Sequence, residues 1–510
     1  MTLMPRTVVR LVVAILLVLT ALVAIRLGAL DRDGPAHDWV SIGDGIPATL
    51  YLPFEDDDGG LPYQRPVGER PPVVVIAHGY SADQAVMSPL ARSLAEAGYA
   101  TLTFDFRGHG SNTDRFSGDL VDDVTDVVDW VETSPLVDGS RIAVLGHSMG
   151  AGAVLDFATQ DERPLAVIPV SGGWQVNDEV VPGNIFLIRA DGDPSRIRDR
   201  QDEIAEDLTD TDASVVTSEV VGKDHISILF SNTAIREIVE FLDPVMGVDR
   251  DGPTPGLDDP RLRAALVYLL LALVVVGLVG LLTARFVDPL PSTATAGGLA
   301  LVAGALVITV PVMAGGGINV LPLGAGQPVV VQTLLAAAAL WGTRALVGRG
   351  VVGGRVATWM GEGPWLPLRA VAWPGVATGL GLFILLSPLS IVSHRFVPTP
   401  ERLVLWGIVT LMALPFFAAF EALVRRGGTW QAVGWGVLGR LILLVVLVAG
   451  LAAGVLPSVI ALVLPLLIVQ YLVLEVFAAT CYARGRNPAV IAVVESVFIA
   501  WVVVTLTPIG

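Results

Sequence analysis

The stretch Arg141-Ile-Ala-Val-Leu-Gly-His-Ser-Met-Gly150, followed by Ala151-Gly-Ala-Val-Leu155, predicts the fold of the first half of the chain. A run of apolar residues that ends at a glycine is typical of a buried strand in a parallel sheet. The small residues after it allow the next helix to pack closely on that sheet. Ser148 then lies at the apex of a tight turn, where Gly146 and Gly150 remove Cβ atoms that would clash.

This turn, with the pattern G-x-S-x-G, resembles the nucleophile elbow of the α/β-hydrolase superfamily, in which a strained turn exposes a serine hydroxyl. The chain contains 54 glycines, so the five-residue motif alone is weak evidence, and its strand-to-helix setting supports the interpretation. The resemblance covers about residues 38–245. It implies an α/β-hydrolase fold, with a mostly parallel sheet and helices on both faces, and Ser148 as the nucleophile.

In this family an acid and then a histidine follow the nucleophile, and the serine needs the histidine as its general base. Only two histidines follow Ser148. His394 lies among apolar segments, so His225, which follows an apolar strand, is the candidate base. In the preceding loop, Asp191-Gly-Asp193, the family spacing selects Asp193 as the acid, and Asp191 remains the alternative.

The resemblance also implies an oxyanion hole formed by two backbone N–H groups, those of Tyr80 and Met149. Tyr80 ends the turn His78-Gly-Tyr80, which follows an apolar strand and matches the family's H-G-x pattern. The segment Asp105-Phe-Arg-Gly-His-Gly110 matches a further loop of the family. Four motifs in the family order favour a serine hydrolase over an inactive fold that only binds a ligand.

No metal and no cofactor are expected. His109 and His147 lie inside the family motifs, so a structural role is the simpler interpretation. A metal site built on them would need a carboxylate partner that the spacing does not supply.

Composition indicates that part of the chain spans a membrane. Of 510 residues, 53% are hydrophobic, and the mean hydropathy is +0.67. Residues 31–260 contain 43 acidic and 15 basic residues, and the rest contains 6 acidic and 17 basic residues. So acidic a segment would repel a phosphate backbone, which argues against nucleic acid as a partner. Cys481, the single cysteine, excludes an intrachain disulfide.

Four segments are predicted along the chain: an N-terminal signal anchor at residues 1–30, the hydrolase domain at 31–248, an acidic linker at 249–261 and a membrane domain at 262–510. No inserted cap is expected in the hydrolase domain, because the connection between residues 171 and 184 is short. We expect about eight spans in the membrane domain. They lie at about 262–286, 294–314, 328–347, 371–392, 402–424, 437–456, 457–480 and 488–508.

Arginine positions predict the orientation, because basic residues are retained in the cytoplasm. Arg6 and Arg10 precede the anchor, which places the acidic domain on the outer face of the cell membrane. With nine spans, the arginines predicted inside are Arg285, Arg344, Arg349, Arg355, Arg369, Arg425, Arg426, Arg440, Arg484 and Arg486. Those predicted outside are Arg261, Arg263, Arg395 and Arg402.

Glu475 and Glu495 lie within predicted spans, and an ionisable residue in lipid is a candidate functional group. Arg484 and Arg486 are their expected partners. These glutamates keep a second interpretation open: a transporter or lipid-handling protein whose outer domain binds a ligand.

The leading hypothesis is a membrane-anchored serine hydrolase that cleaves an ester through an acyl-enzyme on Ser148. An acyltransferase is a further alternative. Attachment to the membrane at both ends of the domain suggests a lipidic or lipid-linked substrate. Its expected access route is lined by Tyr80, Trp174 and the loops near Ile318 and Phe396.

Overall fold

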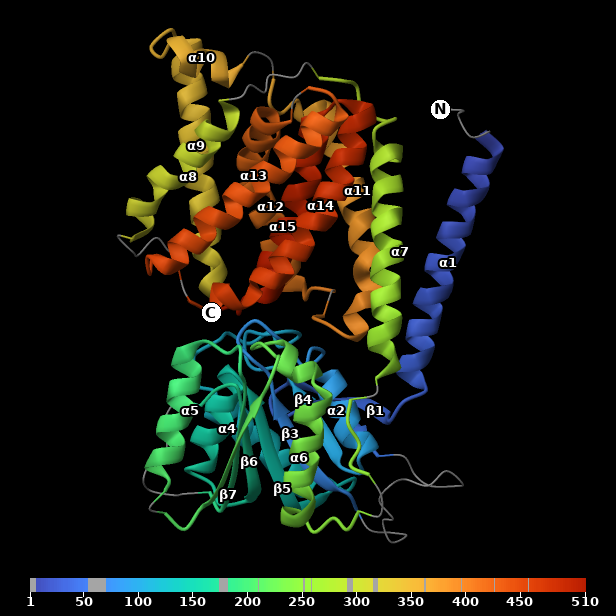
Figure 1. Cartoon of the computed structure of the whole chain (residues 1–510), viewed down its shortest axis with the longest axis vertical. Helices are drawn as coiled ribbons and strands as arrows, with labels where there is room; N and C mark the ends of the chain where they lie inside the picture. Colours follow the sequence, from blue (N-terminus) through green and yellow to red (C-terminus); the bar gives the residue numbers. More distant parts are fainter. Residues whose placement is uncertain are drawn as a thin grey trace. The chain divides into compact units, whose positions relative to one another are not determined.

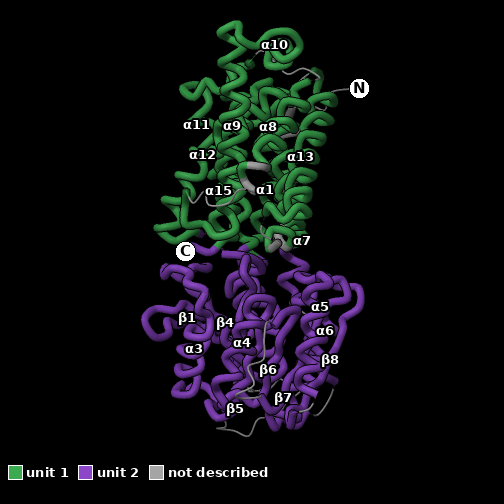
Figure 2. The backbone as a smooth tube through the Cα atoms, turned by 90° about the vertical axis from the view of Figure 1, so that its left-hand side faces the viewer, with its two compact units in different colours: residues 1–25, 266–389, 398–507 green, residues 26–265, 390–397, 508–510 purple. Residues whose placement is uncertain are grey.

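The chain forms two compact units, coloured separately in Figure 2. The sheet unit comprises Arg26–Ala265, Ser390–Val397 and Pro508–Gly510, and the helical unit comprises Met1–Ile25, Leu266–Leu389 and Pro398–Thr507. The computed structural model describes residues 6–53, 70–173, 182–209, 211–250, 253–257, 259–290, 297–314, 320–361, 364–395, 397–425, 427–456 and 458–510.

One eight-stranded sheet forms the centre of the sheet unit, with the strand order β1-β2-β4-β3-β5-β6-β7-β8 (Figure 1). The strands are β1 Ala36–Ile42, β2 Ile46–Leu52, β3 Pro72–Ala77, β4 Ala100–Phe104, β5 Asp138–His147, β6 Pro164–Val170, β7 Asn184–Ala190 and β8 Ser214–Val220. β2 pairs antiparallel with β1 and β4, and all neighbours from β4 to β8 are parallel. The expected mostly parallel sheet is confirmed.

Helices cover both faces of this sheet, because their apolar stripes pack on the two apolar sides of the parallel strands. α2 (Ser88–Glu96) and α6 (Asn232–Val245) cover one face. α3 (Val121–Thr133), α4 (Met149–Ala158) and α5 (Ser195–Asp207) cover the other. In α6, for example, the buried residues are all apolar and recur at helical spacing: Ala234, Ile235, Ile238, Val239 and Leu242.

The carboxyl ends of parallel strands lie at one edge of the sheet, so the loops that follow them meet there. Residues 78–80 follow β3, Ser148 follows β5, residues 191–193 follow β7 and His225 lies shortly after β8. The fold therefore gathers the sequence motifs at one edge. The connection from β6 to β7, on which the expectation of a capless site depends, contains residues 174–181, which lie outside the described residues.

The helical unit consists of long apolar helices and one short helix. They are α1 Arg6–Arg32, α7 Pro260–Thr283, α8 Gly298–Ala314, α9 Gln327–Gly348, α10 Gly354–Met360, α11 Leu368–Leu386, α12 Pro400–Val424, α13 Thr429–Ala452, α14 Leu464–Gly485 and α15 Pro488–Leu506, some of whose ends belong to the sheet unit. The short 3-10 helices of the chain are η1 Ser227–Phe230, η2 Gly324–Gly326, η3 Ser387–Ile391 and η4 Ser458–Val463. Among the described residues, 8 helices are long and apolar enough to cross a membrane, which is compatible with a multi-pass membrane protein.

The bounds of two helices differ from the expected spans. The sequence predicts spans at 437–456 and 457–480, whereas α13 is Thr429–Ala452 and α14 is Leu464–Gly485. Hydropathy alone placed the start of α13 too late, because polar and glycine residues in its first turns, such as Thr429, Gln431 and Gly434, lower the local hydropathy although they belong to the helix.

Two arginines and three glutamates meet inside the helical unit: Glu421 and Arg425 at the end of α12, Arg440 of α13, Glu475 of α14 and Glu495 of α15. Arg425 donates to both carboxylate oxygens of Glu475 at 2.7 Å and to Glu421 at 2.6 Å. Arg440 contacts Glu475 and Glu495. Burial of unpaired charge is costly, so these pairs hold the helices together.

The expected partners of these glutamates were therefore wrong. Arg425 and Arg440 pair with Glu475, and Arg440 pairs with Glu495, whereas Arg486 donates to the carbonyl oxygen of Gly427 at 2.6 Å. Arg425 and Arg440 are consequently buried in the interior of the helical unit and are not exposed loop residues.

Arg440→Met is expected to destabilise the helical unit by about 3–5 kcal/mol, because it leaves the carboxylate of Glu495 buried without a guanidinium partner. The measurement is the thermal unfolding midpoint of the full-length protein in detergent. Arg349→Met, at an exposed position after α9, is the matched control. Equal midpoints for the two variants would contradict the prediction.

Candidate active site

Ser148 occupies the strained turn between β5 and α4. Its backbone has φ 54° and ψ −109°, a conformation that residues with a side chain rarely adopt. A Cβ at Gly146 would lie 2.1 Å from the carbonyl oxygen of Gly150, and one at Gly150 would lie 2.5 Å from that of Ala77. The turn can therefore form only with glycine at both positions.

The structure brings three candidate residues into one hydrogen-bonded chain. His225 Nε2 lies 2.9 Å from Ser148 Oγ, and His225 Nδ1 lies 2.6 Å from Asp193 Oδ1. The histidine is 4% exposed and the aspartate is 4% exposed. Such an arrangement can move the serine proton to the imidazole, while the carboxylate orients the ring and stabilises its charged form.

Asp193 is held by two groups besides His225. Its Oδ2 accepts hydrogen bonds from Ser171 Oγ at 2.6 Å and from the N–H of Ala190 at 2.8 Å. Asp191, the alternative acid, instead accepts from the N–H of Lys223 at 3.1 Å. Ser171 was not among the site residues predicted from the sequence. The available signal was its place directly after β6, at the same edge of the sheet as the other site residues.

The two candidate oxyanion donors come from separate elements. Met149 is the first residue of α4, where an N–H group has no acceptor within the helix. The turn that contains Tyr80 lies against the nucleophile, since a Cβ built on Gly79 would be 3.4 Å from Ser148 Cβ. His109 Nε2 lies 2.8 Å from the carbonyl oxygen of Tyr80.

Comparison with known proteins agrees with this geometry. Residues 68–190 match the family described as serine aminopeptidase, S33. The sheet unit has the α/β-hydrolase fold. The match includes the elbow and the turn at Tyr80.

Individual relatives cover only part of the chain. An uncharacterized 31.7 kDa protein of Escherichia coli is 35% identical over 133 residues, which is 25% of this chain and 42% of that protein. Cutinase 2 of Thermobifida cellulosilytica is 28% identical over 131 residues, which is 25% of this chain and 45% of the cutinase. The chain thus spans less than half the length of these relatives. The structure of an esterase from Pyrobaculum calidifontis, with 17% identity and a TM-score of 0.34, covers 44% of this chain and 90% of that one.

Burial and hydrogen bonds together set the protonation states around the candidate site. Burial acts to raise the pKa of Asp193, but the hydrogen bonds from His225 and Ser171 outweigh it and lower that pKa below its ordinary value. Burial lowers the pKa of His147 to about 3 and that of His78 to about 4. Asp193 is therefore ionised at neutral pH, and both of these histidines are neutral.

The two neutral histidines have structural contacts, as expected for His147. His147 Nε2 lies 2.7 Å from the carbonyl oxygen of His225, so this nitrogen donates and the ring supports the candidate base. His78 accepts from the N–H of Phe106 at 3.2 Å, and its Nδ1 lies 2.8 Å from the carbonyl oxygen of Gly79.

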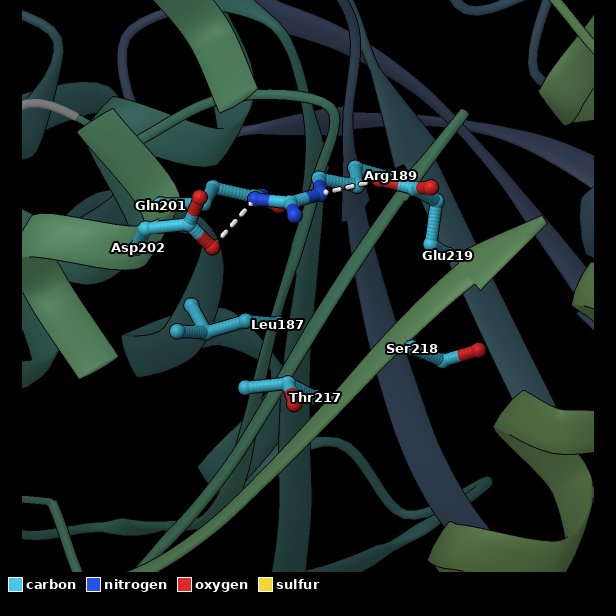
Figure 3. A pocket seen from close by; sticks show the side chains of 7 residues that line it. All are labelled: Leu187, Arg189, Gln201, Asp202, Thr217, Ser218 and Glu219. Atoms are coloured by element: carbon cyan, nitrogen blue, oxygen red, sulfur yellow. Dashed lines mark hydrogen bonds and ion pairs between the residues drawn. The ribbon is translucent and has the colours of Figure 1, made fainter. Parts of the chain in front are cut away.

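A hollow of about 110 Å³ lies elsewhere in the α/β-hydrolase (Figure 3). Its lining residues, from β7, α5 and β8, are Leu187, Arg189, Gln201, Asp202, Thr217, Ser218 and Glu219. Arg189 is paired with Asp202 at 2.6 Å and with Glu219 at 3.0 Å. Ligand sites are usually about 300–1,000 Å³, so this smaller hollow with its internally paired charge is not a substrate site.

Proposed function

We propose that this protein is a membrane-anchored serine hydrolase that cleaves carboxylic esters through an acyl-enzyme on Ser148. His225 is the general base, and Asp193 orients its ring. The N–H groups of Tyr80 and Met149 bind the oxyanion. The single observation that carries the proposal is the hydrogen-bonded chain from Ser148 through His225 to Asp193. The backbone of Ser148, where this chain begins, has a strained conformation.

The proposed reaction has two halves. His225 Nε2 takes the proton of Ser148 Oγ as the oxygen attacks the carbonyl carbon, and the resulting oxyanion accepts hydrogen bonds from the two N–H groups. Collapse of this intermediate breaks the ester bond, and the imidazolium protonates the leaving alcohol. Water then attacks the acyl-enzyme by the same route and releases the acid. An acceptor alcohol in place of water would make the enzyme an acyltransferase.

Covalent labelling tests the mechanism. A fluorophosphonate should phosphonylate the full-length wild type at Ser148 and should not label Ser148→Ala. Ser140→Ala, which replaces an exposed serine at the start of β5, is the matched control and should label normally. Absence of wild-type labelling would favour the rival interpretation, a ligand-binding outer domain on a transporter or lipid-handling protein.

An ester substrate is supported by the similarity to cutinases, although the matching family is described as an aminopeptidase. The test compares turnover of a p-nitrophenyl ester with that of an aminoacyl amide. Apolar helices precede and follow the sheet unit along the sequence, and this attachment to a membrane further favours a lipidic substrate. Of the residues expected to line its access route, Trp174, Ile318 and Phe396 lie outside the described residues.

Chain connectivity supports a specific membrane topology. Arg26–Ala265, Ser390–Val397 and Pro508–Gly510 belong to one compact unit and must therefore lie on one side of a bilayer. An even number of crossings then separates Ala265 from Ser390. The long helices α7, α9 and α11 supply three, so α8 must be the fourth. Its 17 residues extend about 25 Å, close to the thickness of a bilayer core.

The remaining helices agree with this count, since α12 to α15 supply an even number of crossings before Pro508. Arg6 and Arg10 favour a cytoplasmic N-terminus, and the sheet unit, which follows the first crossing, would then lie on the outer face. The proposed location is thus the cell membrane, with the hydrolase outside.

Cysteine labelling tests the role of α8. In a Cys481→Ser background, we expect Val320→Cys, after α8, to react with an impermeant maleimide in intact cells. Phe286→Cys, before α8, should react only after permeabilisation. Ser117→Cys, at an exposed position of the sheet unit, is the control for the outer face. Reaction of Val320→Cys only after permeabilisation would show that α8 does not cross.

A further inference from the structure

Two short segments from the second half of the chain belong to the sheet unit. Ser390–Val397 connects η3 with α12, and Pro508–Gly510 follows α15. Both contact the loops beside Ser148, although more than two hundred residues separate them from it in sequence. The first segment includes His394, which the sequence analysis set aside because it lies among apolar segments.

His394 contacts the turn that carries the proposed oxyanion donor. Its Nε2 lies 2.6 Å from the carbonyl oxygen of Ser81, and because that oxygen can only accept, the imidazole donates. On the adjacent residue, the carbonyl oxygen of Tyr80 contacts His109 at 2.8 Å. Two consecutive peptide groups after the donor N–H are thus held by imidazoles from two distant parts of the chain.

Arg395 extends this contact to the following residues of the turn. Its backbone N–H donates to Asp83 Oδ2 at 2.6 Å, while Asp83 Oδ1 accepts from the N–H of Ala85 at 3.0 Å. Its guanidinium contacts Ser111 Oγ and lies 4.7 Å from the ring centre of Trp39. One segment therefore links the turn after β3 with the loop that contains the D-x-R-G-H-G motif.

The second segment supports that same loop. The N–H of Ile509 donates to the carbonyl oxygen of Gly108 at 2.9 Å, and its carbonyl oxygen accepts from the N–H of Phe116 at 2.7 Å. The ring of Phe116 packs edge-on against Tyr80 and His109, with centroids 6.0 and 5.3 Å apart. Ile509 is 3% exposed.

We infer that Ser390–Val397 and Pro508–Gly510 are built-in positioning segments for the oxyanion turn of the hydrolase. His394 is the main positioning residue, acting through Ser81 on the N–H of Tyr80. The inference rests on the proposed function, because it assigns a role within that reaction. Ser390–Val397 lies between η3 and α12, and Pro508–Gly510 follows α15, so the geometry of the turn depends on chain that does not belong to the central α/β fold.

The test measures steady-state kinetics of the full-length protein on a p-nitrophenyl ester. His394→Ala should lower kcat by about 10- to 100-fold with little change in KM, because a displaced donor weakens transition-state binding more than substrate binding. His394→Gln keeps a donor at the distal nitrogen position and should recover much of the loss. Rates are divided by the number of active sites titrated with fluorophosphonate, so that a smaller folded fraction does not affect kcat.

His37→Ala is the matched control, since this histidine also contacts a backbone carbonyl oxygen, that of Pro35, at the far edge of the sheet. The His37→Ala variant should have the same kcat as the wild type. A wild-type kcat for His394→Ala, with Ser148→Ala inactive, would overturn the positioning role and leave the proposed function intact. Activity in Ser148→Ala would instead overturn the proposed function.

Ile509 provides an independent pair of variants. Ile509→Pro removes the N–H that donates to Gly108, whereas Ile509→Ala keeps it. We expect the proline variant to have the lower kcat per titrated site. Equal kcat for proline, alanine and wild type would exclude the C-terminal segment from the positioning role.

Discussion

Replacement of Ser148 by alanine in the full-length protein is expected to lower kcat for ester hydrolysis by about 10⁶-fold, the largest effect of any single change in the chain. In the proposed mechanism this hydroxyl forms the acyl-enzyme, and the strained backbone at φ 54° presents it to the substrate. The measurement is steady-state turnover, together with the circular dichroism spectrum of each variant.

His225→Ala should lose nearly as much activity as Ser148→Ala, and the double variant should lose little more, because the two residues act as one unit. We expect the loss to arise in catalysis, and the circular dichroism spectrum of each variant checks that the fold is kept. Ester turnover that survives in Ser148→Ala would exclude the acyl-enzyme mechanism. Additive losses would show that the residues act separately.

Asp193→Asn should lower kcat by about 10⁴-fold. The carboxylate accepts a hydrogen bond from His225 Nδ1, and an asparagine can present its amide donor there, which favours the wrong tautomer of the imidazole. The change also removes the charge that stabilises the imidazolium. The measurement is kcat on the same ester, with thermal unfolding as a check on the fold.

Asp191→Asn is the matched control for the acid. Its side chain accepts from the N–H of Lys223, and an asparagine oxygen can do the same, so activity should stay near that of the wild type. Loss of activity in Asp191→Asn with retention in Asp193→Asn would reverse the assignment of the acid.

Much of the fold and of the candidate site could be predicted from the sequence, because both depend on local patterns. The elbow requires glycines at two fixed positions around Ser148, and that requirement is visible in five residues. The buried parallel strands appear as apolar runs. Since such strands end at one edge, the order of the loops was enough to bring Asp193 and His225 to Ser148.

Helix bounds were less predictable where tertiary contacts compete with local preference. The amphipathic pattern of residues 84–97 predicts a helix that begins at Gln84, but α2 begins at Ser88. Gln84 instead donates from its backbone and side chain to the buried carboxylate of Asp105, and its side chain accepts from Thr49. These contacts with Asp105 and Thr49 keep Gln84 in the loop before α2.

The sequence by itself determined the elbow, the order of strands and helices, and the residues that can form the nucleophile, base and acid, because glycine spacing and apolar periodicity are local properties. Only the tertiary structure decided that Ser171 donates to Asp193, that Arg440 pairs with Glu495, and that His394 contacts the turn after β3. Each of these contacts joins residues that are distant in the chain. No local pattern encodes such a contact, because the partner is selected by the packing of whole elements and by the cost of leaving a buried polar group unpaired.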